Sequence, residues 1–169
     1  MSDPERNAAA TAPVGADELR NFAGSFATGV VVLTTTGEDG TLYGLTMNAV
    51  SCVCLDPPLF LACVDKRSAT LPPLLEFGAF ALNILARDQE AIAKLFASKN
   101  SGKFAEVAHS KGKLGLPLIE DALASAEFRV VDTLEVGDHV IIVGEAVAST
   151  IRDHAPLGYF RGKYATIEP

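Results

Sequence analysis

The stretch ALASAEFRVVDTLEVGDHVIIVGEAVASTIR, residues 122–152, decides the fold because it encodes two long runs of strand-forming residues around a two-residue turn. Both runs are rich in Val, Ile and Thr, which favour strands over helices. Gly137 and Asp138, which separate the runs, suit a tight hairpin turn. We therefore predict two long antiparallel strands, with His139 directly after the turn.

Shorter strands are predicted on both sides of this hairpin. Residues 29–36 and 42–55 form a second predicted hairpin, and further strands are expected at 58–65, 78–85 and 158–164. Asp56 and two prolines are expected to end the 42–55 strand, because proline cannot donate to a ladder. No regular alternation of strand and helix is visible, so the order predicts a mainly β fold, an antiparallel barrel with short helices.

Helices are predicted at 17–26 and 88–98, each beginning near an aspartate that can act as its N-cap, Asp17 and Asp88. The first carries three apolar residues at helical spacing, which we expect to anchor it in the core: Leu19, Phe22 and Phe26. A short helix broken by two prolines is expected within 66–78. Residues 98–117, rich in Gly, Lys and Ser, predict a long surface connection.

The overall composition is that of one globular domain. The chain has 169 residues, of which 49% are hydrophobic and 21% charged. We expect residues 1–16 to be a disordered tail and residues 17–169 to be the folded domain. No apolar run is long enough to span a bilayer, and no signal peptide is recognisable, which predicts a cytoplasmic protein. A net charge of −7 argues against nucleic acid as the partner.

The common catalytic signatures are missing from the sequence. No glycine-rich dinucleotide or phosphate loop, GxSxG elbow or HExxH helix is present. The histidines are too dispersed to indicate a metal site. The three cysteines are best explained as small apolar side chains in a reducing compartment: Cys52, Cys54 and Cys63. If the protein is an enzyme, a bound cofactor supplies the chemistry and the protein supplies position.

Two segments could contact such a cofactor. GLTMNAVSCV, residues 44–53, has small and polar residues within a strand, which let a flat ligand approach the backbone. A strand with one face in solvent would have the same pattern. KRSAT, residues 66–70, combines two cations and two hydroxyls, which suits a phosphate. An ordinary solvated loop is the alternative.

Two further segments lie nearer the C-terminus. His139 stands at the start of an apolar strand, either as a functional group or as a structural residue held by Asp138. Residues 159–162 bring aromatic side chains and an arginine together. Plain packing with the arginine extending to solvent is the alternative there.

Taken together, these segments resemble the flavin reductase family, the short NAD(P)H:flavin oxidoreductases that supply reduced flavin to a partner monooxygenase. The resemblance runs from about Leu19 to Tyr164 and rests on the order and spacing of its pieces: FATGVVVLTT, GLTMNAVSCVCLDPPLFLACV, SAT, GAFALNIL, the 89–96 helix, GLPLI, GDHVIIVGEA and PLGYFRGKY. Family members often have Thr-Ala-Ser-Ser where this chain has Thr46-Met47-Asn48-Ala49. That difference favours backbone contacts to the flavin over hydroxyl contacts.

The resemblance implies an FMN-binding split barrel, an antiparallel Greek-key barrel that forms a homodimer with its site near the subunit interface. It implies that FAD or FMN is bound by two segments and two single residues: Thr46, Met47, Asn48, Ala49, Val50, Ser51, Lys66, Ser68, Ala69, Thr70, Asn83 and Phe104. It implies that NADH, or NADPH, is bound by a histidine and a later segment: His139, Tyr159, Phe160, Arg161 and Gly162.

Hydride transfer between two stacked rings needs no general base, so His139 is expected to position the nicotinamide and to move no proton. Two other functions fit the same barrel. One is a flavin-binding module without turnover, and the other is an oxidase of the pyridoxamine phosphate type. The sequence does not distinguish FAD from FMN.

Overall fold

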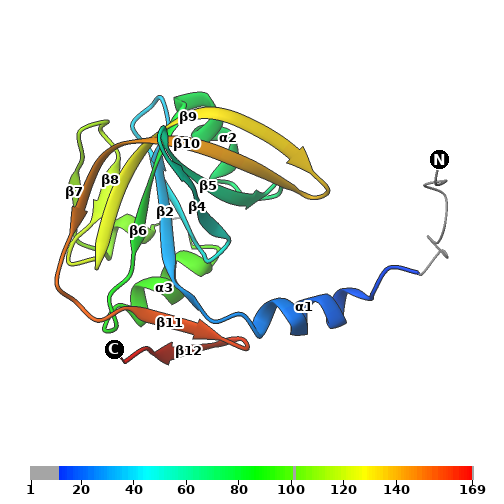
Figure 1. Cartoon of the computed structure of the whole chain (residues 1–169). Coiled ribbons are helices and arrows are strands. Elements are labelled where there is room, and N and C mark those ends of the chain that lie inside the picture. Colours follow the sequence, from blue (N-terminus) through cyan, green and yellow to red (C-terminus); the bar gives the residue numbers. More distant parts are fainter. Residues whose placement is uncertain (1–11, 101, 169) are drawn as a thin grey trace, which may run out of the picture.

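The computed structural model describes residues 12–100 and 102–168, and most of its strands belong to one curled sheet (Figure 1). The strands of this sheet are β2 (Val31–Thr36), β3 (Leu42–Met47), β4 (Val50–Leu55), β5 (Pro58–Asp65), β6 (Ala79–Ile84), β9 (Ala124–Val136) and β10 (His139–Ile151). They lie in the order β3-β2-β6-β9-β10-β5-β4, and each neighbouring pair is antiparallel. The prediction of a mainly β, antiparallel fold is confirmed.

The long hairpin predicted from residues 122–152 forms the middle of this sheet. His139 pairs with Val136 across the turn, and the ladder continues to Ile151 opposite Ala124. A register shift follows Val143, and Gly144 faces the core beside Phe80 and Phe128. A Cβ at position 144 would lie 2.7 Å from both neighbours, so only glycine fits the space.

The two edge strands of the sheet, β3 and β4, follow each other in the chain. They are joined by only two residues, Asn48 and Ala49, although they are the first and last strands of the order. Because so short a link cannot span a flat seven-stranded sheet, the sheet must curl until its edges approach. No ladder joins β3 to β4 within the described residues, so the sheet is not closed.

The curl encloses one core, and a second core lies outside it. Val31 and Leu33 of β2 face the inner core with residues of the other strands and of α2 (Leu71–Phe77). Val30 and Val32 face the outer core, which is covered by α3 (Glu90–Ala97) through Ala93 and by other elements. The β2 strand is therefore buried on both faces.

Two smaller sheets complete the fold. One contains β1 (Thr28–Gly29), β11 (Leu157–Phe160) and β12 (Lys163–Thr166), so the single strand expected at 158–164 is instead a hairpin with its turn at Arg161–Gly162. The other contains β7 (His109–Lys111) and β8 (Pro117–Ile119), preceded by the short helix η1 (Lys103–Ala105).

The surface connection expected over 98–117 is mostly exposed or half-buried in its described residues, but it contains η1, β7 and the start of β8 and contributes buried residues. Val107 and Leu116 are buried, and Ile119 lies in the outer core. The β7–β8 hairpin is held to β9 by Glu127, which is 2% exposed and accepts hydrogen bonds from the amides of Lys113 and Leu114, both at 2.7 Å.

The helices depart from their predicted caps and packing. The first, α1 (Ala16–Gly24), has Gly15 at its N-cap, and α3 has Gln89; neither cap side chain bonds the helix, so Asp17 and Asp88 are not the caps. In α2 the two prolines lie in the first turn, where they do not break the helix.

The predicted core anchors of α1 are exposed. The exposed fractions of Phe22 and Phe26 are 78% and 76%, and α1 extends beside the sheet with no buried residue (Figure 1). Its start at Ala16 falls inside the tail predicted for residues 1–16, of which residues 1–11 lie outside the described part. None of the described helices is long and apolar enough to cross a membrane.

Candidate functional site

The link between β3 and β4 is the first part of the candidate site. Asn48 and Ala49 are exposed where the ladder of β3 ends, and Ser51 is exposed at the start of β4. The Thr46 hydroxyl donates a hydrogen bond to the carbonyl oxygen of Ala93 in α3 at 2.7 Å. Thr46 is therefore anchored to the helix. The Asn48 side-chain amide donates to the Thr28 hydroxyl at 3.1 Å, and Ala49 is exposed beside it.

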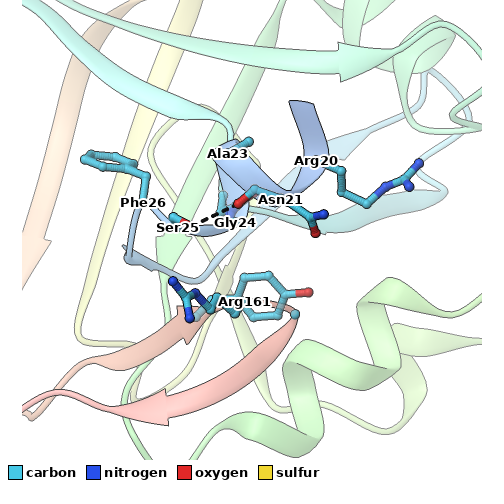
Figure 2. Close-up of a pocket in the computed structure, with 10 residues that line it drawn as sticks. Arg20, Asn21, Ala23, Gly24, Ser25, Phe26 and Arg161 are labelled. Carbon is cyan, nitrogen blue, oxygen red and sulfur yellow. Dashed lines mark hydrogen bonds between the residues drawn. The ribbon is translucent and has the colours of Figure 1, made fainter. Parts of the chain in front are cut away.

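A cavity of about 610 Å³ lies between α1 and the β11–β12 hairpin (Figure 2). Its walls are formed by residues of α1 and the segment after it, by Asn48, and by the predicted nicotinamide segment: Arg20, Asn21, Ala23, Gly24, Ser25, Phe26, Asn48, Tyr159, Arg161 and Gly162. A smaller cavity of about 190 Å³ adjoins it and is lined by Val30, Thr46, Met47, Asn48, Ala97, Tyr159 and Tyr164. Asn48 and Tyr159 line both cavities, so the predicted flavin and nicotinamide segments meet here.

The turn of the β11–β12 hairpin sets the position of the arginine in this cavity. Arg161 has a φ of 48° and Gly162 a φ of 78°, the pattern of a type I′ turn. The Arg161 amide donates to the Gly24 carbonyl oxygen at 2.9 Å, which ties the turn to the end of α1. The guanidinium carbon lies 5.1 Å from the centre of the Phe160 ring.

The loop after β5 is the second part of the site, and it lies against the turn that precedes His139. His139 pairs with Asp65 in the β5–β10 ladder, and the Lys66 amide donates to the Asp138 carbonyl oxygen at 2.9 Å. The fold therefore brings together the 66–70 segment and His139, which are far apart in the sequence. Nδ1 of His139 lies 2.7 Å from Oδ1 of Asp138, so a donor at Nδ1 leaves Nε2 for another partner.

The cations of this loop are already paired with carboxylates. Lys66 Nζ lies 2.7 Å from Glu135 Oε2, and the Arg67 guanidinium lies 2.7 Å from Asp65 Oδ2. The Arg67 side chain, which donates to Asp65, holds the pKa of that carboxyl well below its usual range. Lys66 lowers the pKa of Glu135 in the same way. A phosphate at this loop would therefore compete with Glu135 for Lys66.

The hydroxyl and amide groups of the loop are also engaged. The Ser68 hydroxyl accepts a hydrogen bond from the Thr70 amide at 3.2 Å, and Thr70 is 4% exposed. The amides of Arg67 and Ser68 donate to the side chain and backbone of Asp65. Ala69 is exposed. A ligand would meet mainly the Lys66 and Ser68 side chains and the backbone around Ala69.

The two parts of the site are connected through β5. The Cys63 amide donates to the Ala49 carbonyl oxygen at 2.9 Å, and Asp65 follows Cys63 by two residues. At a rise of about 3.3 Å per residue, Ala49 lies roughly 10 Å along the strand from Lys66, the start of the 66–70 loop. The β3–β4 link thus stands between the cavity and the loop, within the length of one flavin.

Asn83 has a structural role, which corrects its prediction as a cofactor contact. It is fully buried, and its amide nitrogen donates to the Val32 carbonyl oxygen and the Thr34 hydroxyl. Its side-chain oxygen accepts from the Ile119 amide and the Ser125 hydroxyl, both at 2.9 Å. All its hydrogen-bonding capacity is used inside the protein.

Phe104 is half-buried against the outer core. Its ring lies 5.0 Å from that of Phe96 and 5.2 Å from that of His109, both edge-on. Neither cavity described above includes it among its walls. Its predicted contact with the flavin therefore stays a prediction.

The residues that α1 contributes to the cavity were missed by sequence reasoning. Arg20 and Asn21 stand on the polar side of a helix that was predicted only by its apolar residues. Phe26 was expected in the core and instead forms part of the cavity wall. The sequence gives no signal for these positions, because only the fold brings α1 beside the hairpin.

The fold is that of a small protein built on one curled antiparallel sheet, with the candidate site at the link between its two edge strands. Residues 23–168 match the flavin reductase like domain, and the chain belongs to that family. It is 40% identical over 156 residues to the flavin reductase (NADH) of Kitasatospora aureofaciens, with 90% of this chain and 82% of that protein covered.

Two more relatives support the assignment. The reductase component of 4-nitrophenol 4-monooxygenase/4-nitrocatechol 2-monooxygenase from Rhodococcus opacus is 38% identical over 157 residues, covering 93% of this chain and 84% of that protein. The structure of the NADH:FAD oxidoreductase SgcE6 of Streptomyces globisporus C-1027, in complex with NAD and FAD fragments, has a TM-score of 0.86 and 33% identity, covering 90% of this chain and 93% of that chain.

Some relatives are longer than this chain. It covers 48% of the reductase component of the flavin-dependent trigonelline monooxygenase of Acinetobacter baylyi, with 38% identity. The chain therefore spans about half the length of that curated relative.

Proposed function

We propose that this protein is an NADH-dependent flavin reductase that supplies reduced FAD or FMN to a partner monooxygenase. The observation that carries the proposal is that Asn48 and Tyr159 each line both cavities. The segment expected to hold the flavin and the segment expected to hold the nicotinamide thus form one continuous surface. The names of the relatives from Kitasatospora aureofaciens and Rhodococcus opacus support the activity and the kind of partner.

The groups around the β3–β4 link fit a flavin. A flavin combines a flat ring, a polyhydroxylated chain and a phosphate. The site has small and polar residues at the β3–β4 link, which suit the ring and the chain, and the Lys66–Thr70 loop, which suits the phosphate. We infer that Thr46 to Ser51 lie along the ring and chain, mainly through backbone groups, because the Thr46 hydroxyl is already bonded to Ala93. Lys66 and Ser68 would hold the phosphate, with Glu135 released from Lys66.

A bound flavin would supply the hydride acceptor of the reaction, and the nicotinamide would supply the hydride. The protein's part is to place the rings in contact and to keep their orientation, which removes much of the entropic barrier. His139 would orient the nicotinamide nucleotide through Nε2 while Asp138 holds Nδ1. Tyr159 and Arg161 would contact the same nucleotide from the cavity wall.

We further propose a homodimer built on an FMN-binding split barrel. The unclosed edges at β3 and β4 are consistent with the split barrel. In the single chain α1 has no buried residue, and Leu19 and Phe22 are 56% and 78% exposed on a part of α1 that does not line the cavity. Such residues favour a partner surface. Light scattering should show a dimer that weakens in the Phe22→Ser variant; a wild-type monomer would refute this proposal.

The domain limits and the cytoplasmic location stay predictions. Within the proposed reaction, NADH is favoured over NADPH, in keeping with the names of the NADH-dependent relatives.

The decisive experiment measures oxidation of NADH and NADPH with added FMN, FAD or riboflavin. We expect rapid NADH oxidation that depends on flavin and saturates with it. A folded protein that binds flavin without oxidising either nicotinamide would instead be the flavin-binding module. Oxidation of pyridoxamine phosphate with consumption of oxygen would support the third function.

A further inference from the structure

The loop of residues 66–70, which is proposed to hold the flavin phosphate, is surrounded by more acidic than basic side chains. We propose that Glu135 is a specificity-determining residue: its charge beside Lys66 makes the loop favour a singly charged flavin phosphate, as in FAD, over the doubly charged phosphate of FMN. The inference rests on the proposed function and deepens it, because it concerns which of the two flavins this chain takes.

Three carboxylates and two permanent cations meet at this loop. Lys66 pairs with Glu135, and Arg67 pairs with Asp65, each at 2.7 Å. Asp138 lies in the adjoining turn, where its carbonyl oxygen accepts a hydrogen bond from the Lys66 amide at 2.9 Å. The histidine that follows Asp138 adds at most one positive charge. The group therefore has no surplus of positive charge with which to balance a phosphate.

Arg67 is less available to a ligand than Lys66 is. Its guanidinium donates to both carboxylate oxygens of Asp65, at 3.1 and 2.7 Å, and its amide donates to the same carboxylate at 2.8 Å. The amides of Ser68 and Thr70 donate to the Asp65 carbonyl oxygen and to the Ser68 hydroxyl. Because these donors are used inside the loop, Lys66 is the main cation that a phosphate would meet.

Lys66 reaches Glu135 across the strand that lies between them, β10. Val140 of β10 pairs with Glu135 of β9 and with Val64 of β5, and Lys66 follows Val64 by two residues, so all four lie on one face of the sheet. The Glu135 side chain is 77% exposed, which lets it lie beside a bound ligand. The hydrogen bond from Lys66 lowers the pKa of the Glu135 carboxyl, so this group is charged at neutral pH.

The two flavins differ in the charge that their phosphate brings to Lys66. A phosphomonoester such as that of FMN carries about −1.5 to −2 at neutral pH. The same phosphate in FAD belongs to a diphosphate bridge and carries one charge, and the other charge lies on the next phosphorus. Two oxygens that accept hydrogen bonds from one ammonium group lie within roughly 5 Å of each other, where charges interact appreciably. Glu135 therefore repels the second charge of FMN, which FAD lacks at this position.

The test measures flavin binding by calorimetry, without turnover. Its key ligand is riboflavin 5′-sulfate, whose ester has the shape of the FMN phosphate but carries one charge and has no adenosine. Glu135→Gln keeps an oxygen that can accept from Lys66 and removes the charge. We expect this variant to bind FMN about three- to tenfold more tightly than the wild type does. It should tighten the sulfate ester and FAD by a smaller factor and leave riboflavin unchanged.

Asp132→Asn is the matched control. Asp132 is an exposed carboxylate of the same strand, so the substitution changes the net charge of the protein by the same amount. Its side chain accepts a hydrogen bond from the Thr133 amide, and its position three residues before Glu135 places it on the opposite face of β9. The control should bind FMN, the sulfate ester and riboflavin as the wild type does.

Three results would overturn the inference: FMN binding that is unchanged in Glu135→Gln, an equal gain for FMN, the sulfate ester and riboflavin, or an equal gain in Glu135→Gln and Asp132→Asn. Oxidation of NADH, measured in parallel, separates this inference from the proposed function. If the flavins bind in the expected order but no nicotinamide is oxidised, the proposed function fails while the role of Glu135 stands. If NADH is oxidised and Glu135→Gln shows no selective gain for FMN, only the inference fails.

Discussion

Arg161 gives the sharpest prediction, because its backbone and its side chain act on different measurable quantities. Its φ of 48° is unfavourable for any residue except glycine, with a cost of about 1–2 kcal/mol for an ordinary side chain. The guanidinium stacks on the exposed Phe160 ring, which contributes about 0.5–1 kcal/mol. Glycine and alanine both remove the guanidinium, but only glycine removes the backbone cost.

The stability of the two variants should therefore differ in a defined direction. Arg161→Gly gains the relief of the positive φ and loses about 0.4–1 kcal/mol to the greater entropy of the unfolded chain. It should be more stable than Arg161→Ala by about 1 kcal/mol, or a Tm higher by about 2–4 °C for a domain of this size. Thermal unfolding followed by circular dichroism measures this difference.

Their kinetics should be the same. Both variants lose a charged contact to the nicotinamide nucleotide, so each should raise the KM for NADH by about tenfold with little change in the KM for flavin. If alanine is as stable as glycine, the turn does not hold Arg161 at positive φ. If the two variants differ in KM, the effect comes from the shape of the turn and the guanidinium is not the contact.

Four more predictions follow from the site and the core. His139→Ala should raise the KM for NADH about 3- to 10-fold with little effect on flavin, since it loses one hydrogen bond; His154→Ala, an exposed histidine outside the site, is the control, and equal effects of the two would make His139 structural. Replacing Lys66 and Ser68 together by Ala should weaken binding of FMN and leave riboflavin unaffected; equal loss for both flavins would remove the loop from the phosphate site. Glu127→Gln should lower the free energy of unfolding by about 1–3 kcal/mol in urea titration, because the new amide NH₂ faces one of two backbone donors at 2.7 Å; an unchanged midpoint would contradict this. Asp65 has a folded pKa below its unfolded value of 3.8, so its stabilising effect is present above that value and is lost as the pH falls through the folded pKa; Asp65→Asn should flatten the acid side of the stability curve, and an unaltered curve would argue against the pair with Arg67.

The central strands could be predicted from the sequence because their signals are local. The Gly137-Asp138 turn and the β-branched runs around it specify the β9–β10 hairpin without reference to any other part of the chain. The same reasoning gives β5 and the pairing of β2 with β3. The prediction of a single strand over 42–55 is wrong, because the run divides at Asn48 and Ala49 into β3 and β4, which lie at opposite edges of the sheet. The position of residues 66–70 beside His139 was harder to predict, because it depends on the pairing of β5 with β10, which are far apart in the sequence.

The errors share a physical cause. A sequence pattern indicates the local structure and chemistry of a residue, but it does not indicate which residues distant in the sequence contact it. Helical spacing places Leu19 and Phe22 on one face of α1 but does not say whether anything covers that face. Asn83 in an apolar strand is compatible with a ligand contact or with a buried polar network, and only its four partners decide. Leu116 and Ile119 become core residues because groups distant in the sequence, Glu127 and Asn83, hold their hairpin against the sheet.

The edge position of β4 has a practical consequence for work with the purified protein. Val50–Leu55 carries no charged residue and, within the described part of the chain, forms a ladder only on the side of β5. An unpaired apolar edge strand can form a ladder with the edge strand of another molecule, which leads to aggregation. Because Cys52 is exposed on this edge, contact between two such strands brings thiols together, and air oxidation would then lock the aggregate covalently. Concentrated stocks should stay clear when a reductant is present and become turbid in its absence, and Cys52→Ser should make the reductant unnecessary.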